Sequence, residues 1–378
     1  MTIFIILSGN FAYADKESEV IDNIQENTDK QIEQLNWKEL ENFLSTLDNS
    51  LINSGVVDAV KKIIKGEMDV QEIDYFQFLI QIFFGKIIDL LPSVLTIVVI
   101  SLLLGVLVKK DNSFIRGTSE VVYFVCYAVI VIVTLIAVWK LIEHTRRTIQ
   151  DIKKLSNLAL PILLTLISAI GGKVTLSVFQ PSVAIFCGTI IEIVTIAILP
   201  LAIMSIVFTV ISNLSSNIKL EKLAKFFHSS ATIILGIVFT VFTAFLTIKG
   251  VSAGTIDSVS IRAAKFATKN YVPILGGYLA EGFDLILASS VLIKNAFGIV
   301  GLFALLTIIT SPIIEIIAYS LSLQLASAVT EPVTDKRVVS FLSSISKSLT
   351  VLYLTVLAVA FMLFVVILLL ICSVNAFV

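Results

Sequence analysis

Long apolar runs follow one another along most of this chain, from Ile87 to Ile371. Several of them reach the ~18–20 residues that an α-helix needs to cross a bilayer. The pattern predicts an all-α, polytopic helical membrane protein with about six to ten spans, whose function lies at or across a membrane. The apolar runs are Ile87–Val108, Val121–Leu141, Leu158–Ile170, Val178–Leu214, Ala231–Ile248, a piece that ends at Ile293, Ala296–Ala328 and Leu349–Ile371.

The first residues have two features of a secretory signal peptide. Ile3–Leu7 form a short apolar core, and Ala12-Tyr13-Ala14 match the small-residue signature of a cleavage site. The usual basic start is missing, because no Lys or Arg precedes Lys16. Either the true start codon lies upstream or the signal is atypical. We predict a signal peptide at residues 1–14, whose cleavage leaves residues 15–85 outside the cytoplasm.

Residues 15–85 are acidic, whereas the apolar body is basic. The acidic region has 15 acidic and 6 basic residues, and the chain from Lys86 onward has 21 basic and 13 acidic residues. Apolar residues recur at helical spacing in the acidic region, which predicts two or three amphipathic helices. These helices form either a spacer or a docking surface. We therefore divide the chain into the signal peptide, an acidic helical extracytoplasmic region (15–85) and a multi-span membrane domain (86–378).

The membrane domain contains two segments that match at an offset of 112 residues. Pro161 pairs with Pro273 and Pro200 with Pro312, within the same order of elements. The pattern predicts repeat units at about 109–220 and 221–332, followed by a terminal span at 349–371. Many transporters are built from such repeats, with the pathway at the repeat interface. Because proline removes a helical hydrogen bond, we expect these four prolines to kink or break their helices.

Basic residues precede each repeated span, at Lys109-Lys110, at Lys219 and Lys222, and at Lys336-Arg337. The positive-inside rule places all three loops in the cytoplasm, which favours parallel repeats with an even number of crossings. The stretch Glu143–Asn157 is equally basic and would fall on the opposite side. A basic amphipathic helix that lies in the membrane interface would resolve this conflict.

Sequence motifs for catalysis are missing, because the chain has no P-loop, no HExxH and no GxSxG. We expect no enzyme activity, no catalytic residue, no cofactor and no metal site. Ionisable residues inside the apolar runs are the remaining candidates for a polar pathway, since such residues are costly in lipid. An internal ion pair is the alternative interpretation. The candidates are Glu192 and Glu315, which lie deepest in their runs, and Glu281, Asp284 and Lys294.

The segment Gly254–Leu302 resembles the stage III sporulation protein AE family of endospore-forming bacteria. The resemblance rests on an R-x-x-K-F…N-x-x-P-[IV]-L-G pattern at Arg262–Gly276, and it continues through Leu287–Asn295 and Gly298–Gly301. It extends over nearly the whole chain, including the signal peptide and the acidic region. The weak signal start departs from the family pattern and puts only the start site in question.

The resemblance implies a component of the channel-like complex between the mother cell and the engulfed forespore. The implied location is the mother-cell membrane around the forespore. The implied partners are the lipid bilayer and other stage III A-group proteins, including a secretion-type ATPase and ring-forming proteins, and not nucleic acid. Two alternatives remain open from the residues alone: an ion-coupled secondary transporter that works by itself, and a non-conducting membrane scaffold.

Overall fold

The computed structural model describes residue 28 and residues 37–46, 56–65, 75–109, 116–214, 220–271 and 276–373. The predicted signal peptide lies outside these ranges. Within them the secondary structure is helical, without strands. Two short helices, α2 (Lys38–Ser45) and α3 (Val56–Lys65), precede the long helix α4 (Tyr75–Lys109). Helix α4 thus begins ten residues or so before the predicted boundary of the membrane domain.

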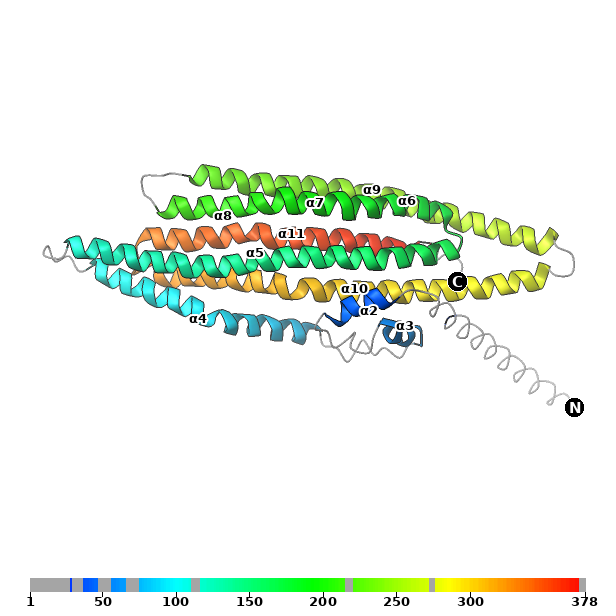
Figure 1. The fold of residues 1–378 in the computed structure, drawn as a ribbon, viewed down its shortest axis with the longest axis horizontal. Helices are drawn as coiled ribbons and strands as arrows, with labels where there is room; N and C mark the ends of the chain where they lie inside the picture. Colours follow the sequence, from blue (N-terminus) through cyan, green and yellow to red (C-terminus); the bar gives the residue numbers. More distant parts are fainter. Residues whose placement is uncertain are drawn as a thin grey trace, which may run out of the picture.

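The long helices lie lengthwise in one elongated bundle (Figure 1). Helices α5 (Arg116–Ala169), α9 (Glu221–Tyr271) and α10 (Gly276–Thr330) contain 54, 51 and 55 residues. At 1.5 Å per residue each is about 80 Å long, far more than the ~30 Å hydrocarbon core of a bilayer. Stretches that we predicted as separate elements are therefore parts of single helices. In particular, the basic stretch Glu143–Asn157 continues the axis of α5 and is not a separate helix.

A third path along the bundle is formed by α6 (Lys173–Ile185), η2 (Phe186–Ile190), α7 (Ile191–Ile193), η3 (Val194–Ile198) and α8 (Leu199–Leu214). The last long helix is α11 (Lys336–Cys372). Six stretches of the described chain are long and apolar enough to span a membrane, which makes the protein a multi-pass membrane protein. They are Ile80–Val106, Val121–Ala169, Lys173–Asn213, Glu221–Ile248, Asp284–Thr330 and Lys336–Cys372.

The long helices alternate in direction. Helices α4, α8 and α10 end, and α5, α9 and α11 begin, at the same end of the bundle (Figure 1). The three basic loops of the sequence therefore connect helices at one shared end, as the positive-inside rule requires. At the opposite end α5 turns into α6 at Gly171, which has a φ of +89°. Glycine fits this turn because its missing Cβ permits a positive φ.

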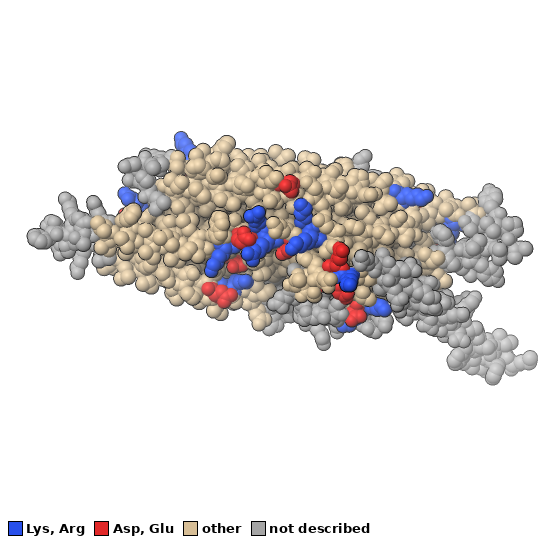
Figure 2. Space-filling view, viewed as in Figure 1, with Lys and Arg blue, Asp and Glu red and all other residues tan. Residues whose placement is uncertain are grey.

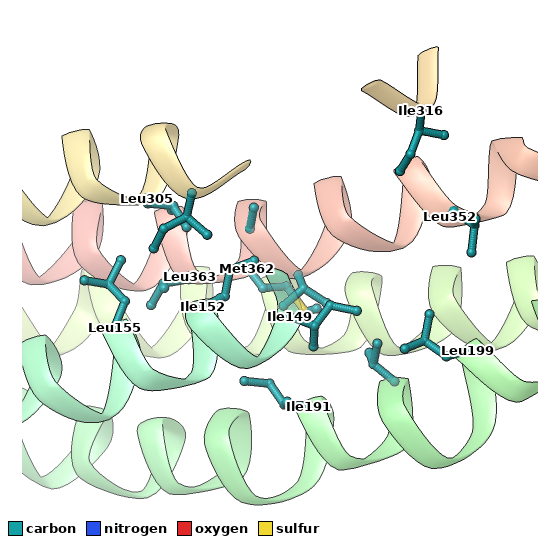
Figure 3. Packing of buried hydrophobic residues seen from close by; sticks show 14 of the residues in the cluster. Ile149, Ile152, Leu155, Ile191, Leu199, Leu305, Ile316, Leu352, Met362 and Leu363 are labelled. Carbon is teal, nitrogen blue, oxygen red and sulfur yellow. The ribbon is translucent and has the colours of Figure 1, made fainter. Parts of the chain in front are cut away.

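Helix α11 lies at the centre of the bundle and packs against α5, α8, α9 and α10. Figure 3 shows apolar side chains of α5, α7, α8, α10 and α11 converging in this core. Met362, Leu363 and Leu352 of α11 are fully buried there. Outer helices instead expose large apolar side chains, which suits contact with lipid. Ile88 of α4 and Phe124 of α5 are 62% and 68% exposed.

Helical structure continues past three of the four prolines that we predicted to kink or break their helices, and a kink at these positions stays a prediction. Pro161 and Pro312 lie inside α5 and α10, which are helical on both sides of them. Pro200 is the second residue of α8, just after the π-helical turn η3, and the path stays helical there too. A proline removes only one backbone donor, and neighbouring helices hold the segment in place within a packed membrane bundle.

The predicted repeat receives no direct support from these prolines. Pro161 lies within α5, eight residues before its last residue Ala169. Its predicted counterpart Pro273 follows the last residue of α9, Tyr271, and lies outside the described residues. The units 109–220 and 221–332 stay a prediction. Each unit does contain one helix that runs away from the basic end and one path that returns to it.

Candidate intramembrane polar site

Charged side chains gather midway along one face of the bundle. Figure 2 shows Lys, Arg, Asp and Glu side chains over the middle of α5, on a surface that is otherwise largely uncharged. Glu315 of α10 and Glu192 of α7 pair with residues of α5, and Lys86 of α4 pairs with Glu315. We call this set the polar belt: Lys86, Glu143, His144, Arg147, Asp151, Lys153, Lys154, Glu192 and Glu315.

The middle of α5 is amphipathic, which explains how one helix carries both a core face and the polar belt. Ile149, Ile152 and Leu155 recur at three-residue spacing and are 0–1% exposed. In Figure 3 they lie on the side of α5 that faces Ile191 and Met362. Residues at this spacing share one side of a helix, so the intervening charged residues lie on the other side.

Glu315 is the centre of the best-formed interaction in the polar belt. Its Oε2 accepts a hydrogen bond from His144 Nδ1 at 2.7 Å, and Lys86 Nζ lies 3.9 Å from the same oxygen. The three side chains come from α4, α5 and α10, and each is about one-third exposed or less. A half-buried carboxylate with two cationic or hydrogen-bonding partners is both neutralised and fixed in position.

Glu192 has a much looser environment. Its nearest basic group is Lys153 Nζ at 3.9 Å, and its side chain is 54% exposed. The remaining pairs of the belt join neighbouring turns of α5: Arg147 with Glu143, and Lys154 with Asp151. Exposed pairs of this kind contribute little to stability. The belt is therefore held in place by the packing of α5, and only Glu315 ties three helices together.

The other predicted residues lie away from the belt. Asp284 Oδ1 lies 2.5 Å from Lys265 Nζ, and this ion pair links α9 to α10. Lys294 is fully buried and donates to the carbonyl oxygens of Ile371, at 2.9 Å, and Ser373. A cation at this position satisfies the free carbonyls at the end of α11 and matches the helix dipole. Glu281 belongs to α10, and its side chain is not among those described.

The polar belt lies level with apolar stretches of the helices on other sides of the bundle. Ser156 Oγ of α5 lies 3.0 Å from Cys187 Sγ. The neighbouring Phe186 stacks on Phe242 of α9, with ring centroids 5.6 Å apart. Phe239 of α9 in turn packs against Phe361 of α11. A bilayer placed around these apolar stretches thus reaches the height of the charged face of α5.

That arrangement has an energetic consequence. A charged side chain at the centre of a bilayer costs roughly 2.5–3.5 kcal/mol on insertion scales. Several exposed charges in a row are too costly to face lipid, so the belt requires water or protein against it. Within the described residues, no three His, Cys, Asp or Glu side chains come together in a way that suits a metal ion.

Two of the polar contacts had no signal in the sequence. His144 and Glu315 are 171 residues apart, and His144 lies in a basic stretch that gave no reason to pair it with a carboxylate. Asp257 of α9 is 1% exposed and accepts hydrogen bonds from the backbone N–H groups of Val174 and Thr175. It caps the first turn of α6 from another helix. A motif search cannot find such caps, because donor and acceptor are 82 or more residues apart.

Comparison with known proteins decides the family. The family model for stage III sporulation protein AE matches residues 55–374. The chain belongs to this family. Stage III sporulation protein AE of Bacillus subtilis (strain 168) is 25% identical over 358 residues, which cover 94% of this chain and 90% of that protein. No solved structure matches the chain. The expected resemblance is confirmed, and the described chain is a multi-pass membrane member of the stage III AE family.

Proposed function

We propose that this protein is an integral membrane component of the channel-like complex that joins the mother cell to the engulfed forespore. Its proposed location is the mother-cell membrane, among other stage III A-group proteins that include an ATPase and ring-forming proteins. Family membership supports the sporulation context. The polar belt supports the role in a complex, because a charged face at membrane depth requires contact with water or protein.

The belt is the part of the molecule that would meet the pathway or the partner. Ion pairs between neighbouring turns leave Arg147 70% and Lys154 62% exposed, so their charges point out of the bundle. Glu315, with its ties to α4 and α5, fixes the position of this face. We therefore propose that Glu315 is a positioning residue and that the outer charges of α5 are the surface that contacts water or a partner protein.

The short N-terminal helices have a second proposed role, as part of an extracytoplasmic docking region. Trp37, directly before α2, packs edge-on against Phe297 of α10 with ring centroids 5.1 Å apart. Leu40 and Val60 of α2 and α3 are buried. Helix α3 packs against α10, and α2 packs against α5 and α3, so both helices are fixed to the bundle well away from its basic end. Under the proposed topology, that position lies toward the space between the two membranes.

Cysteine labelling tests what the belt faces. In a variant whose Cys126, Cys187 and Cys372 are replaced by alanine, we introduce Arg147→Cys and measure its reaction with a small, charged thiol reagent. The matched control is Ile237→Cys, since Ile237 of α9 is 59% exposed within an apolar stretch. We expect Arg147→Cys to react in membranes that contain this protein alone, and Ile237→Cys to remain unreactive.

The same labelling in sporulating cells distinguishes a water-filled pathway from a partner protein that covers the belt. Continued reaction of Arg147→Cys in the assembled complex indicates a water-filled pathway, and protection indicates a partner protein on the belt. Both outcomes support the proposal. If Arg147→Cys is as unreactive as Ile237→Cys both in membranes with this protein alone and in sporulating cells, the belt faces neither water nor a partner protein. That result would favour a scaffold without a polar pathway. Flux of small metabolites into vesicles that hold the purified protein alone would instead favour a stand-alone transporter.

A further inference from the structure

Helix α9 exposes large apolar side chains over a length that no bilayer covers. Phe226, near its start, is 62% exposed, and Phe266, 40 residues further along the same helix, is 67% exposed. At 1.5 Å per residue the two lie about 60 Å apart. The hydrocarbon core of a bilayer is ~30 Å thick, and ~40–45 Å with its head groups. At least about 15 Å of this apolar length therefore needs a cover other than lipid.

The part outside the bilayer is the stretch of α9 beyond Ile248. The candidate span of α9 is Glu221–Ile248, and the basic loop before it marks its cytoplasmic end. Beyond the span, Asp257 caps α6, and Ile261 shares a small buried cluster with Ile170 at the turn from α5 to α6. Figure 1 shows that α9 and α10 extend together past this turn. They form a helical hairpin on the side of the membrane opposite the basic loops.

This stretch of α9 has an apolar stripe whose spacing suits contact with another helix. Ile256, Val259, Ala263 and Phe266 follow one another at spacings of three, four and three residues, and all four are exposed. We call these residues the outer stripe. Such spacing places them on one side of the helix, and Ile261, on the opposite side, is 7% exposed. A narrow stripe of this kind is the usual seam between two packed helices.

The outer stripe lies among basic residues. The 23 residues that follow Asp257 include no acidic residue and three basic ones, which are Arg262, Lys265 and Lys269. Asp257 itself is 1% exposed and already accepts two backbone hydrogen bonds, so it adds no charge to the surface. The acidic residues of the hairpin, Glu281 and Asp284, belong to α10, and Asp284 pairs with Lys265. Arg262 is exposed, so the α9 side of the hairpin combines apolar groups with positive charge.

We propose that the outer stripe binds an amphipathic helix of a partner protein, whose own apolar stripe is flanked by Asp or Glu. Opposite charges at the edge of an apolar seam fix the partner and its register. A second copy of this chain is a poorer match, because copies in one membrane run in the same direction. Their α9 helices would pair in parallel and bring the Arg262 side chains to the same height. This surface is separate from the polar belt, and the inference does not rest on the proposed function.

Photo-crosslinking of the full-length protein in sporulating cells tests the proposal. The probe is p-benzoylphenylalanine at Val259, in the outer stripe, and the cross-linked peptides are sequenced by mass spectrometry. One control has the probe at Ala264, which is exposed on another side of the same stretch. The other has it at Ile237, which is 59% exposed within the span. We expect Val259 to join an acidic, amphipathic segment of another protein, and both controls to give little protein adduct.

Charge reversal then tests how the partner is recognised. In the protein with the probe at Val259, Arg262→Glu should lower the adduct, relative to the protein level, about fivefold, because it replaces an attraction by a repulsion. The matched control is Lys222→Glu, which reverses an exposed lysine at the other end of α9 and should leave the adduct unchanged. Phe266→Ala shortens the outer stripe without changing its charge and should also lower the adduct. Should Arg262→Glu lower the protein level, Arg262→Gln replaces it.

Three results would overturn the proposal. An adduct between Val259 and a second copy of this chain would identify a contact between copies instead. An adduct with a neutral or basic segment, or an adduct that Arg262→Glu leaves unchanged, would remove the role of charge. A protein adduct at Val259 no greater than that at Ile237 would show that no partner helix covers the outer stripe.

Discussion

Glu315 and Glu192 occupy similar places in the sequence but different environments in the fold. Both lie deep in a long apolar run, Glu315 three residues after Pro312 and Glu192 eight residues before Pro200. Glu315 is held by His144 at 2.7 Å, with Lys86 nearby, in a junction of three helices. Glu192 is more than half exposed, and its basic partner among the described residues is Lys153, at 3.9 Å. Depth in an apolar run therefore does not predict how a carboxylate is held.

The difference comes from helix α4. Helix α4 packs against α5 and α10 on the Glu315 side and brings Lys86 to it. Within the described ranges no helix brings Glu192 a second basic partner within 4.0 Å, so its charge is left exposed on the outer side of α7. Under the proposal, Glu315 thus positions the belt from within, and the exposed Glu192 of α7 joins the outer charges of α5 in the contact surface.

The largest expected effect comes from loosening α4. A Cβ on Gly105 would lie 2.3 Å from the backbone oxygen of Val333, in the turn between α10 and α11. Backbone cannot rotate away as a side chain can, so Gly105→Ala must push α4 outward. We expect it to lower the free energy of unfolding by about 3 kcal/mol, the upper end of the usual range for overpacking, because the backbone oxygen has no rotamer to move to. Thermal unfolding of the purified protein in detergent measures this.

The matched control lies on the same helix. A Cβ on Gly85 would meet no atom within 4 Å. Gly85→Ala should therefore be neutral, or stabilising by up to about 1 kcal/mol through helix propensity. Equal destabilisation by both variants would show that helix packing at Gly105 is not the cause.

The second effect concerns Glu315 itself. Glu315→Ala removes a charged hydrogen-bond acceptor and leaves His144 without its partner, which should cost about 1.5–3 kcal/mol of stability. A double-mutant cycle with His144→Ala isolates the contact. We expect the double variant to lose clearly less than the sum of the two single losses. Purely additive losses would contradict the 2.7 Å interaction.

A functional measurement complements that cycle. Glu315→Gln keeps the size and hydrogen-bonding capacity of the side chain and removes its charge. If Glu315 positions the polar belt, this variant should impair late sporulation while the protein level stays near normal. A drop in the protein level itself would indicate a purely structural ion pair. Full activity of Glu315→Gln would show that the charge of Glu315 is not needed for function.

Hydropathy predicted the features of the fold that depend on local sequence. The all-α multi-span class, the end of an apolar run at Ile170 and the grouping of basic residues before three spans all follow from short stretches of chain. The continuity of α5 could not be predicted in this way. Polar residues such as Arg147 and Lys154 interrupt a hydropathy run without interrupting a helix, because the helix continues where its other side packs on a core.

The candidate site was predicted only in part. Glu315 and Glu192 were found because charge in an apolar run is unusual, and that signal is local. Their partners are set by the packing of helices far apart in sequence, so His144 and Lys86 had no signal. For Lys294, the rule that a charge in an apolar run marks a pathway residue selects a residue with another role. It is fully buried in an apolar run, yet its contacts with Ile371 and Ser373 make it a helix cap.

The smallest expected effect is that of Glu192→Ala. With its side chain 54% exposed and Lys153 3.9 Å away, Glu192 forms an ion pair of the kind that contributes about 0–1 kcal/mol. We expect its loss to change the unfolding temperature of the purified protein far less than Glu315→Ala does. Because Glu192 lies on the proposed contact surface, its effect should appear on assembly. Co-purification of partner proteins from sporulating cells should fall for Glu192→Ala, whereas its yield as an isolated protein should not. A loss of stability equal to that of Glu315→Ala would show that the two carboxylates are held alike, and the distinction between an organising and a contacting residue would then be wrong.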